Sequence, residues 1–262
     1  KPARGGRALA PWLKAAPASA PTAAEKEALA ALFNAGQFTE AEQQARAMTV
    51  RFPQDGFGWK AWGTVLKMQG QAEAALPVLE RALVLMPEDA ETHYNLGALY
   101  QDLGRLSEAE ASYQRAITLK PDNAKAHYNL GIAYQDLGNL TEAEASYRRA
   151  LTLKPDYAKA HLNLGVIFKD LGNLTEAEAS YHRALTLKPD YAEAHNNLGN
   201  TLKDLGHLAE AEASYHRALA LKPDDADAHN NLGNIYKDRG LFSDAEASYH
   251  RALALKPDYA DV

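Results

Sequence analysis

The stretch "AHYNLGIAYQDLGNLTEAEASYRRALTLKPD", residues 126–156, holds two helix-compatible segments separated by a glycine and closed by a proline. Gly138 stands where a helix usually ends, because glycine adopts the left-handed backbone conformation that follows a helix C-terminus. Pro155 ends the second segment, because proline cannot continue a helix and disfavours helical geometry in the preceding residue. The stretch therefore predicts a helix A and a helix B joined by a tight turn.

This pattern recurs every 34 residues along most of the chain. The recurring prolines are Pro53, Pro87, Pro121, Pro155, Pro189, Pro223 and Pro257. The turn glycines are Gly36, Gly70, Gly104, Gly138, Gly172, Gly206 and Gly240. A fixed period of this length indicates a repeat architecture. We expect seven units, at 22–55, 56–89, 90–123, 124–157, 158–191, 192–225 and 226–259.

The unit at 90–123 illustrates the helices that we expect. Helix A covers about 91–103, and helix B opens on Ser107 and Glu110, which have the spacing of a capping box. The same pair of positions is occupied by Thr39/Glu42, Thr141/Glu144, Thr175/Glu178 and Ser243/Glu246. These residues predict an N-terminal side-chain cap on helix B.

A second series of glycines falls inside helix A, at Gly63, Gly97, Gly131, Gly165, Gly199 and Gly233. A glycine inside a helix costs about 0.5–1 kcal/mol relative to alanine. We expect these glycines to allow a close approach of helices A and B, with Leu96 and Tyr113 among the core residues. No unit buries its apolar faces alone, so neighbouring units should stack into a solenoid.

The sequence resembles the tetratricopeptide repeat, whose period is 34 residues. The resemblance covers residues 22–259, and it is strongest in the third to seventh units. It implies an all-α fold, a right-handed superhelical solenoid in which helix A lines a concave groove and helix B lies outside. Tetratricopeptide repeats bind other proteins, so the resemblance also implies a protein-protein interaction module.

A narrower resemblance begins at residues 32–70, "LFNAGQFTEAEQQARAMTVRFPQDGFGWKAWGTVLKMQG", and continues in the repeated "AHNNLGN". These stretches are similar to the N-terminal arms of bacterial SPINDLY-type and O-linked N-acetylglucosamine transferases. The resemblance implies that the chain is a substrate-selecting arm whose glycosyltransferase domain is absent here. A scaffold that only self-associates is a third hypothesis.

One position of helix A carries asparagine in five successive units: Asn95, Asn129, Asn163, Asn197 and Asn231. In the transferase arms that the chain resembles, an equivalent asparagine ladder holds the backbone of an extended polypeptide. A carboxamide has two donors and an acceptor, so it pairs with both halves of a peptide unit whatever the side chain. The alternative is that these asparagines tie neighbouring repeats together through hydrogen bonds between helices.

The positions beside the ladder change along the chain, as expected of a surface that contacts a ligand. One residue before each asparagine come Tyr94, Tyr128, Leu162, Asn196 and Asn230. Three residues after it come Ala98, Ile132, Val166, Asn200 and Asn234. Further along helix A, Lys169, Lys203 and Lys237 are each followed by aspartate. They indicate either a solvated rim or a strip that attracts an acidic segment of the partner.

The composition argues against further classes of function. The net charge of −6 and the pI near 5.9 argue against a nucleic-acid partner. No apolar run reaches the ~20 residues of a membrane-spanning helix, no signal peptide is visible, and cysteine is absent. These features favour a cytoplasmic protein without a membrane contact.

No residue pattern predicts a catalytic site or a cofactor, and we expect no metal. His93, His127, His161, His195 and His229 recur once per unit. Registered residues of stacked helices lie ~8–10 Å apart, which is too far for one zinc ion to bridge. We therefore expect these histidines to pack between repeats.

Both ends of the chain also carry predictions. Residues 1–21 are rich in alanine and proline and predict a leader or linker. Residues 260–262 predict the start of an eighth unit. Because no eighth helix A would then cover Tyr249, Leu253 and Leu255, the C-terminal end should expose apolar surface and self-associate.

Overall fold

The computed structural model describes residues 20–257, which form fourteen α-helices and no strand. The predicted leader and the start of an eighth unit lie, except for residues 20 and 21, outside this described range. The chain divides into two compact units, residues 1–105 and 106–262, with the division between the fifth and sixth helices. Each unit is an all-α stack, in agreement with the predicted fold class.

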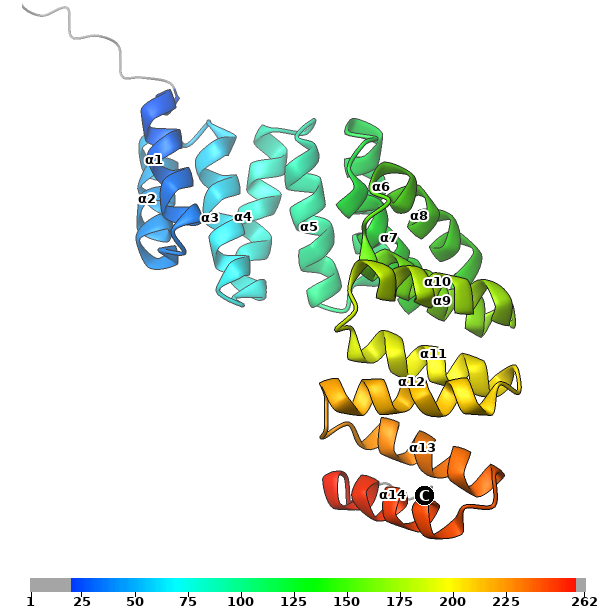
Figure 1. Cartoon of the computed structure of the whole chain (residues 1–262). Coiled ribbons are helices and arrows are strands. Elements are labelled where there is room, and N and C mark those ends of the chain that lie inside the picture. Colours follow the sequence, from blue (N-terminus) through cyan, green and yellow to red (C-terminus); the bar gives the residue numbers. More distant parts are fainter. Residues whose placement is uncertain (1–19, 258–262) are drawn as a thin grey trace, which may run out of the picture. The chain divides into compact units, whose positions relative to one another are not determined.

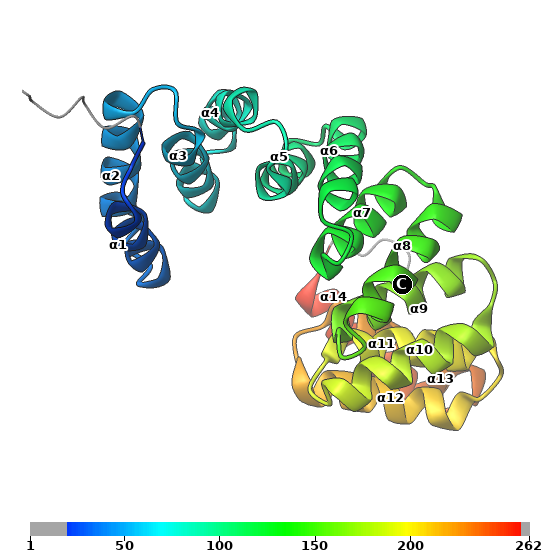
Figure 2. The same ribbon diagram turned by 90° about the horizontal axis from the view of Figure 1, so that it is seen from above.

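The helices follow one another in antiparallel pairs within each unit (Figures 1 and 2). The first unit contains α1 (Ala23–Asn34), α2 (Phe38–Arg51), α3 (Gly56–Met68), α4 (Ala72–Leu85) and α5 (Ala90–Asp102). The second contains α6 (Leu106–Leu119), α7 (Ala124–Asp136), α8 (Leu140–Leu153), α9 (Ala158–Asp170), α10 (Leu174–Leu187), α11 (Ala192–Asp204), α12 (Leu208–Leu221), α13 (Ala226–Asp238) and α14 (Phe242–Leu255). Odd-numbered helices are the expected helices A, and even-numbered helices are the expected helices B.

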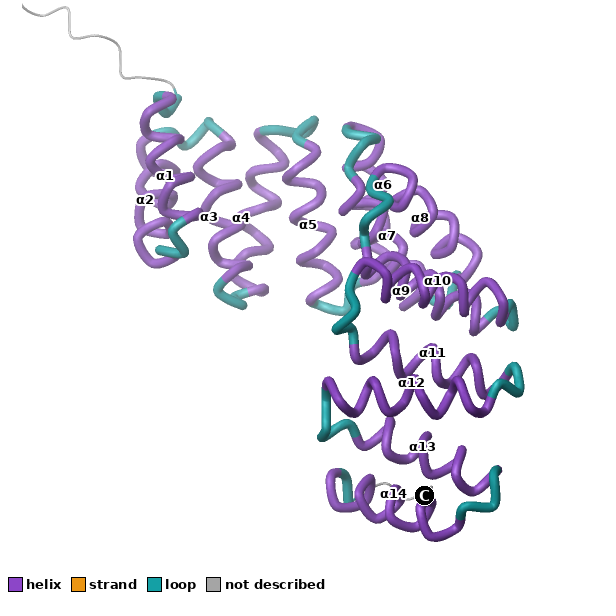
Figure 3. Tube along the Cα trace, viewed as in Figure 1, coloured by secondary structure: helices purple, strands orange, loops and turns teal. Residues whose placement is uncertain are grey.

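Short turns join the helices (Figure 3), and glycine makes the turn between helices A and B possible. All seven turn glycines have a positive φ, between 70° and 83°. After α7, the amide of Gly138 donates to Gln135 O at 2.9 Å and that of Asn139 donates to Tyr134 O at 2.8 Å. These bonds satisfy carbonyl groups that the helix end leaves free.

The predicted capping boxes on α2, α8, α10 and α14 are wrong. Helix α8 begins at Leu140, directly after the glycine turn, so Thr141 already lies in its first turn. The backbone carbonyl of Asn139 accepts from Ala143 at 3.0 Å, and no side chain caps α2, α8, α10 or α14. Side-chain caps occur on helices A instead: Asp89 accepts from Thr92, Asn123 from Ala126, and Asp225 from Ala228.

The glycines inside helix A have the predicted role, and their partner is a tyrosine of helix B. A Cβ atom on Gly165 would lie 2.6 Å from Cε1 of Tyr181, which is far inside van der Waals contact. The same contact joins Gly131 to Tyr147, Gly199 to Tyr215 and Gly233 to Tyr249, whereas Gly63 of the first unit meets Leu79. Helix B thus places a whole aromatic ring against the bare backbone of helix A.

Alanines and these tyrosines form the core of the second unit, where Tyr147, Tyr181 and Tyr215 are fully buried. Their cluster includes Ala177 and Ala211 of helices B together with Ile167 and Leu198 of helices A. The first unit has two separate clusters, one around Leu29 and Val65 and one around Leu79 and Leu99. The repeated core fixes which side of each helix A remains available for other contacts.

Replacing Gly165 with alanine should destabilise the protein by about 1–3 kcal/mol, as overpacking of a core usually does. The rigid ring of Tyr181 occupies the space of the new methyl group. Urea unfolding followed by circular dichroism measures the change. Helix propensity alone would raise stability by about 0.5–1 kcal/mol, so a more stable variant would contradict this packing.

Candidate functional site

The asparagine ladder and its flanking residues lie on one side of the helices A, which we call the helix A face. In the second unit this face comprises the ladder and flanking positions of α7, α9, α11 and α13. Asn163 Nδ2 lies 3.3 Å from the hydroxyl oxygens of Tyr128 and Tyr147. Asn231 Nδ2 donates to Asn196 Oδ1 at 3.3 Å. Ladder asparagines therefore do link neighbouring repeats, as the alternative interpretation expects.

Several asparagine side chains of α11 and α13 keep donors or acceptors that these bonds do not use. The backbone carbonyl of Asn197 accepts from Thr201, whereas its half-buried side chain makes no hydrogen bond to a described residue. Within residues 20–257, Asn196 uses only its oxygen and Asn231 only its nitrogen. We call Asn196, Asn197, Asn200, Asn231 and Asn234 the carboxamide strip. Each of its members is half-buried.

Two members of the strip accept hydrogen bonds from tyrosines of helices B. The hydroxyl of Tyr215 donates to Asn200 Oδ1 at 2.7 Å, and that of Tyr249 donates to Asn234 Oδ1 at 2.8 Å. In the earlier repeat, where Ile132 replaces this asparagine, Tyr147 donates to Gln135 Oε1 at 2.9 Å. The amide nitrogens of Asn200 and Asn234 have no acceptor among the described residues, so they remain available as donors.

Tyr181 is the exception among these tyrosines. Its hydroxyl is buried and has no hydrogen-bond partner in the described part of the chain. Its own repeat, residues 158–191, has Val166 at the position of Asn200 and Lys169 at the position of Gln135. Neither an isopropyl group nor an ammonium group accepts a hydrogen bond. Burial raises the pKa of the Tyr181 hydroxyl, which keeps it a neutral donor at physiological pH.

Two of the predicted site residues, Asn95 and Tyr94, lie in the first unit, both on α5. Asn95 is buried, and its Nδ2 donates to Thr64 Oγ1 of α3 at 3.2 Å. Tyr94 is half-buried, as are Asn129 on α7 and Asn230 on α13 in the second unit. Asn95 is therefore more deeply buried than the other four ladder asparagines.

The three lysines of the predicted strip differ in their contacts. Lys169 Nζ lies 3.6 Å from Asp204 Oδ2 of the next helix A, an exposed pair that contributes little stability. Lys203 and Lys237 form no ion pair with a described residue. Lys203 and Lys237 thus lie on the helices of the carboxamide strip, and neither charge is compensated by an ion pair within residues 20–257.

The registered histidines have a function that the sequence analysis missed. The Nε2 atoms of His93, His127, His161, His195 and His229 each lie 3.0 or 3.1 Å from the carbonyl oxygen of the proline six residues earlier. Trp59 Nε1 makes the same bond to Pro53 O at 3.2 Å. Burial lowers the pKa of His127 and His161, which favours the neutral imidazole. The constant six-residue spacing from proline was a signal that could have revealed this bond.

Within residues 20–257, no three histidine, aspartate or glutamate side chains come together as metal ligands would. None of the helices in this range has the length and apolar character needed to cross a membrane.

Tetratricopeptide-repeat models match the chain at residues 128–192, 181–213 and 226–259, and a further model of this repeat matches 63–104, 101–138 and 199–240. Together they cover residues 63–259, so the chain belongs to the tetratricopeptide-repeat family. Curated proteins yield no match.

Solved structures of the same fold include YrrB, described as a TPR protein with an unusual peptide-binding site. YrrB is 26% identical over 69% of this chain and 93% of its own, with a TM-score of 0.60. PilF of Pseudomonas aeruginosa is 19% identical, covers 78% of this chain and 92% of its own, and has a TM-score of 0.68. MamA is 24% identical over 64% of this chain and 98% of its own, with a TM-score of 0.59.

Replacing Val166 with asparagine should stabilise the protein by about 0.5–1.5 kcal/mol, the usual net contribution of a hydrogen bond. The new carboxamide would accept from Tyr181 as Asn200 accepts from Tyr215. Thermal and urea unfolding measure the gain, and the same substitution in a Tyr181→Phe background serves as the control. An equal gain in both backgrounds would show that the hydroxyl is not involved.

Proposed function

We propose that the chain is a protein-protein interaction module that binds an extended polypeptide on its helix A face. The observation that carries the proposal is the carboxamide strip of α11 and α13. Its side chains are half-buried, and each of them keeps hydrogen-bonding groups that no described residue uses. An extended peptide has an unpaired donor and acceptor at most residues, and carboxamides complement both.

The family and one structural relative support a peptide ligand. Tetratricopeptide repeats mediate protein-protein interaction, and YrrB is described as having a peptide-binding site. The bonds between neighbouring asparagines and tyrosines add a further argument, because a carboxamide that is already anchored loses less side-chain entropy when a ligand binds. One asparagine therefore ties repeats together through one group and faces the ligand with the other.

The lysines beside the strip set the charge that a ligand meets. Lys203 and Lys237 lie on the same helices as the carboxamide strip and lack an ion pair within the described range. We propose that they favour acidic residues in the segment that crosses α11 and α13. This contribution should be modest and salt-dependent, because exposed charges are screened at physiological ionic strength.

The resemblance of residues 32–70 to glycosyltransferase arms stays a prediction. The family models and the three structures described above concern tetratricopeptide-repeat proteins, and none of their names refers to a glycosyltransferase. Sequencing the reading frame beyond the repeats tests the prediction, which expects a glycosyltransferase domain to be encoded next to them.

Asn197→Ala should weaken peptide binding by about 0.5–1.5 kcal/mol and leave folding stability unchanged, because this side chain has no hydrogen-bond partner among the described residues. Peptides selected from a displayed random library on the immobilised protein, then synthesised, serve as ligands for calorimetry. Asn173→Ala is the matched control, since Asn173 is an exposed turn residue whose side chain caps nothing.

The selected peptides test the proposal a second way. If the helix A face binds the peptide backbone, N-methylation of the peptide should abolish binding, whereas permuting its side chains should change affinity only modestly. Tolerance of N-methylation, or an affinity unaffected by Asn197→Ala, would contradict the proposal.

Self-association through α14 remains a separate proposal. Phe242 is 70% exposed, and with Tyr249 and Leu253 it lines a hollow of about 410 Å³. Exposed apolar patches of this kind usually mark association sites. We expect a concentration-dependent sedimentation coefficient that Phe242→Glu abolishes. A wild-type protein that stays monomeric at high concentration would rule this association out.

A further inference from the structure

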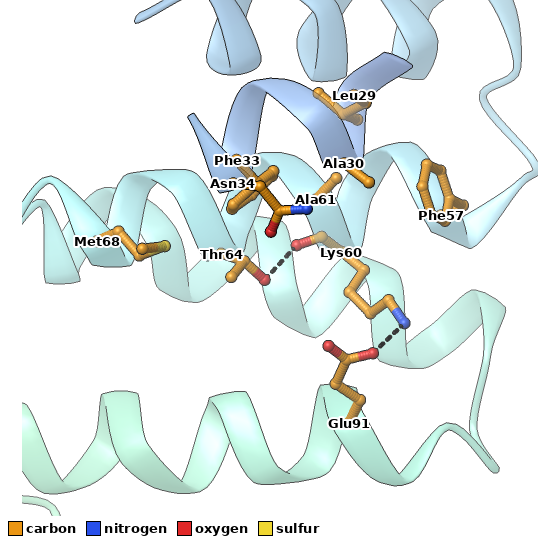
Figure 4. Close-up of a pocket in the computed structure, with 10 residues that line it drawn as sticks. All are labelled: Leu29, Ala30, Phe33, Asn34, Phe57, Lys60, Ala61, Thr64, Met68 and Glu91. Atoms are coloured by element: carbon orange, nitrogen blue, oxygen red, sulfur yellow. Dashed lines mark hydrogen bonds and ion pairs between the residues drawn. The ribbon is translucent and has the colours of Figure 1, made fainter. Parts of the chain in front are cut away.

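The first unit contains an apolar pocket on its helices A that differs in character from the carboxamide strip (Figure 4). The pocket has a volume of about 270 Å³. Leu29, Ala30 and Phe33 of α1 line it on one side, and Phe57, Ala61 and Met68 of α3 line it on another. Met68 is 53% exposed, so part of this apolar surface is open to water.

The polar groups of the pocket are mostly bonded to one another. Thr64 Oγ1 donates to the carbonyl of Lys60 at 2.7 Å and accepts from Asn95. Lys60 Nζ lies 2.8 Å from Glu91 Oε2 and 3.4 Å from Asp89 Oδ2. Burial disfavours the charge of Lys60, but the hydrogen bond to Glu91 and the neighbouring carboxylates outweigh it, so its pKa is raised. The only ammonium in the lining is thus already neutralised by its neighbours.

The volume of the pocket distinguishes a small-molecule ligand from a single side chain as its occupant. Small-molecule sites usually have volumes of about 300–1,000 Å³. A pocket of about 270 Å³ lies below that range and suits a single large side chain. Because the charged groups of the lining are paired with one another, a charged occupant would lose hydration without gaining a counter-ion from the lining. The pocket therefore favours an uncharged, bulky apolar side chain.

One hydrogen bond connects this pocket to the asparagine ladder. Thr64 forms part of the pocket lining and accepts from Asn95, the first ladder asparagine. Both residues belong to the first compact unit. A polypeptide that contacts Asn95 would therefore pass the mouth of the pocket.

We propose that this pocket is an anchor site for one bulky apolar residue, such as leucine, methionine or phenylalanine, of the bound polypeptide. The proposal rests on the proposed function and adds a specificity element to it. Hydrogen bonds to the backbone do not depend on the ligand's sequence, whereas the pocket selects which residue of the ligand lies over α1 and α3. Full burial of such a side chain makes a favourable contribution that sequence-tolerant hydrogen bonds lack.

Methionine methyl groups provide a direct test in the full chain, because the sequence has three methionines, Met48, Met68 and Met86, and only Met68 lines the pocket. The protein is labelled with ¹³C at the methionine methyl groups and titrated with N-acetyl-phenylalaninamide or N-acetyl-leucinamide. We expect a saturable shift of the Met68 signal in the millimolar range, with Met48 and Met86 unchanged. N-acetyl-asparaginamide, similar in shape to the leucine probe but polar, should give no shift.

Filling the pocket should remove this response. Ala30→Phe places a ring at the pocket, whereas Ala31→Phe adds the same ring at the neighbouring exposed position outside the lining. Ala30→Phe should weaken probe binding at least tenfold, and Ala31→Phe should leave it unchanged. The same pair of variants, applied to a library-selected peptide, measures how much the anchor contributes to affinity.

Any one of four results would overturn the proposal. Met68 could fail to respond to the apolar probes, or it could respond equally to N-acetyl-asparaginamide. Alternatively, Trp12→Ser could shift the Met68 signal without any probe, which would make residues 1–19 of the chain itself the occupant. The test of the anchor site is independent of the test of the proposed function, because Asn197→Ala should leave the Met68 response to the probes intact. A selected peptide weakened by Asn197→Ala but insensitive to Ala30→Phe would refute the anchor alone.

Discussion

The contact between a glycine of helix A and a tyrosine of helix B is the constraint on which the second unit depends. It brings the two helices of a pair close together and fixes how each tyrosine ring lies. A ring held against the backbone of helix A carries its hydroxyl toward the helix A face, where it needs an acceptor. The packing of the core and the chemistry of the candidate binding face are therefore consequences of one contact.

This coupling explains why the amides of the helix A face have two uses. Gln135 and Asn200 each accept from a fully buried tyrosine, and removing either would leave a hydroxyl without an acceptor in the core, while Asn234 accepts from the half-buried Tyr249. Their remaining groups, together with the side chain of Asn197, face outward from the same positions. Tyr181 shows the cost when the acceptor is missing, since Val166 and Lys169 leave its hydroxyl unsatisfied. Stability and binding are thus set by overlapping sets of atoms.

The fold was predictable from the sequence because the 34-residue period fixes both helices and both of their ends. Gly138 and Pro155 were sufficient to place the boundaries of the helix pair, whereas Thr141 was misread as a cap because the glycine turn starts the helix earlier than the capping pattern suggests. The bond from His127 to Pro121 and the acceptor role of Asn200 depend on side-chain directions that no periodicity encodes. The apolar pocket was not predicted, because it combines residues of α1, α3 and α5.

The central claim is that the carboxamide strip contacts the backbone of a bound polypeptide. The most direct measurement is a ¹⁵N NMR titration of the side-chain amides of the protein with a library-selected peptide. The account predicts large, saturable shifts for the side-chain amides of Asn197, Asn200 and Asn234, and none for Asn139 and Asn173 in the turns before α8 and α10. Shifts confined to helices B, with the carboxamide strip unaffected, would contradict it.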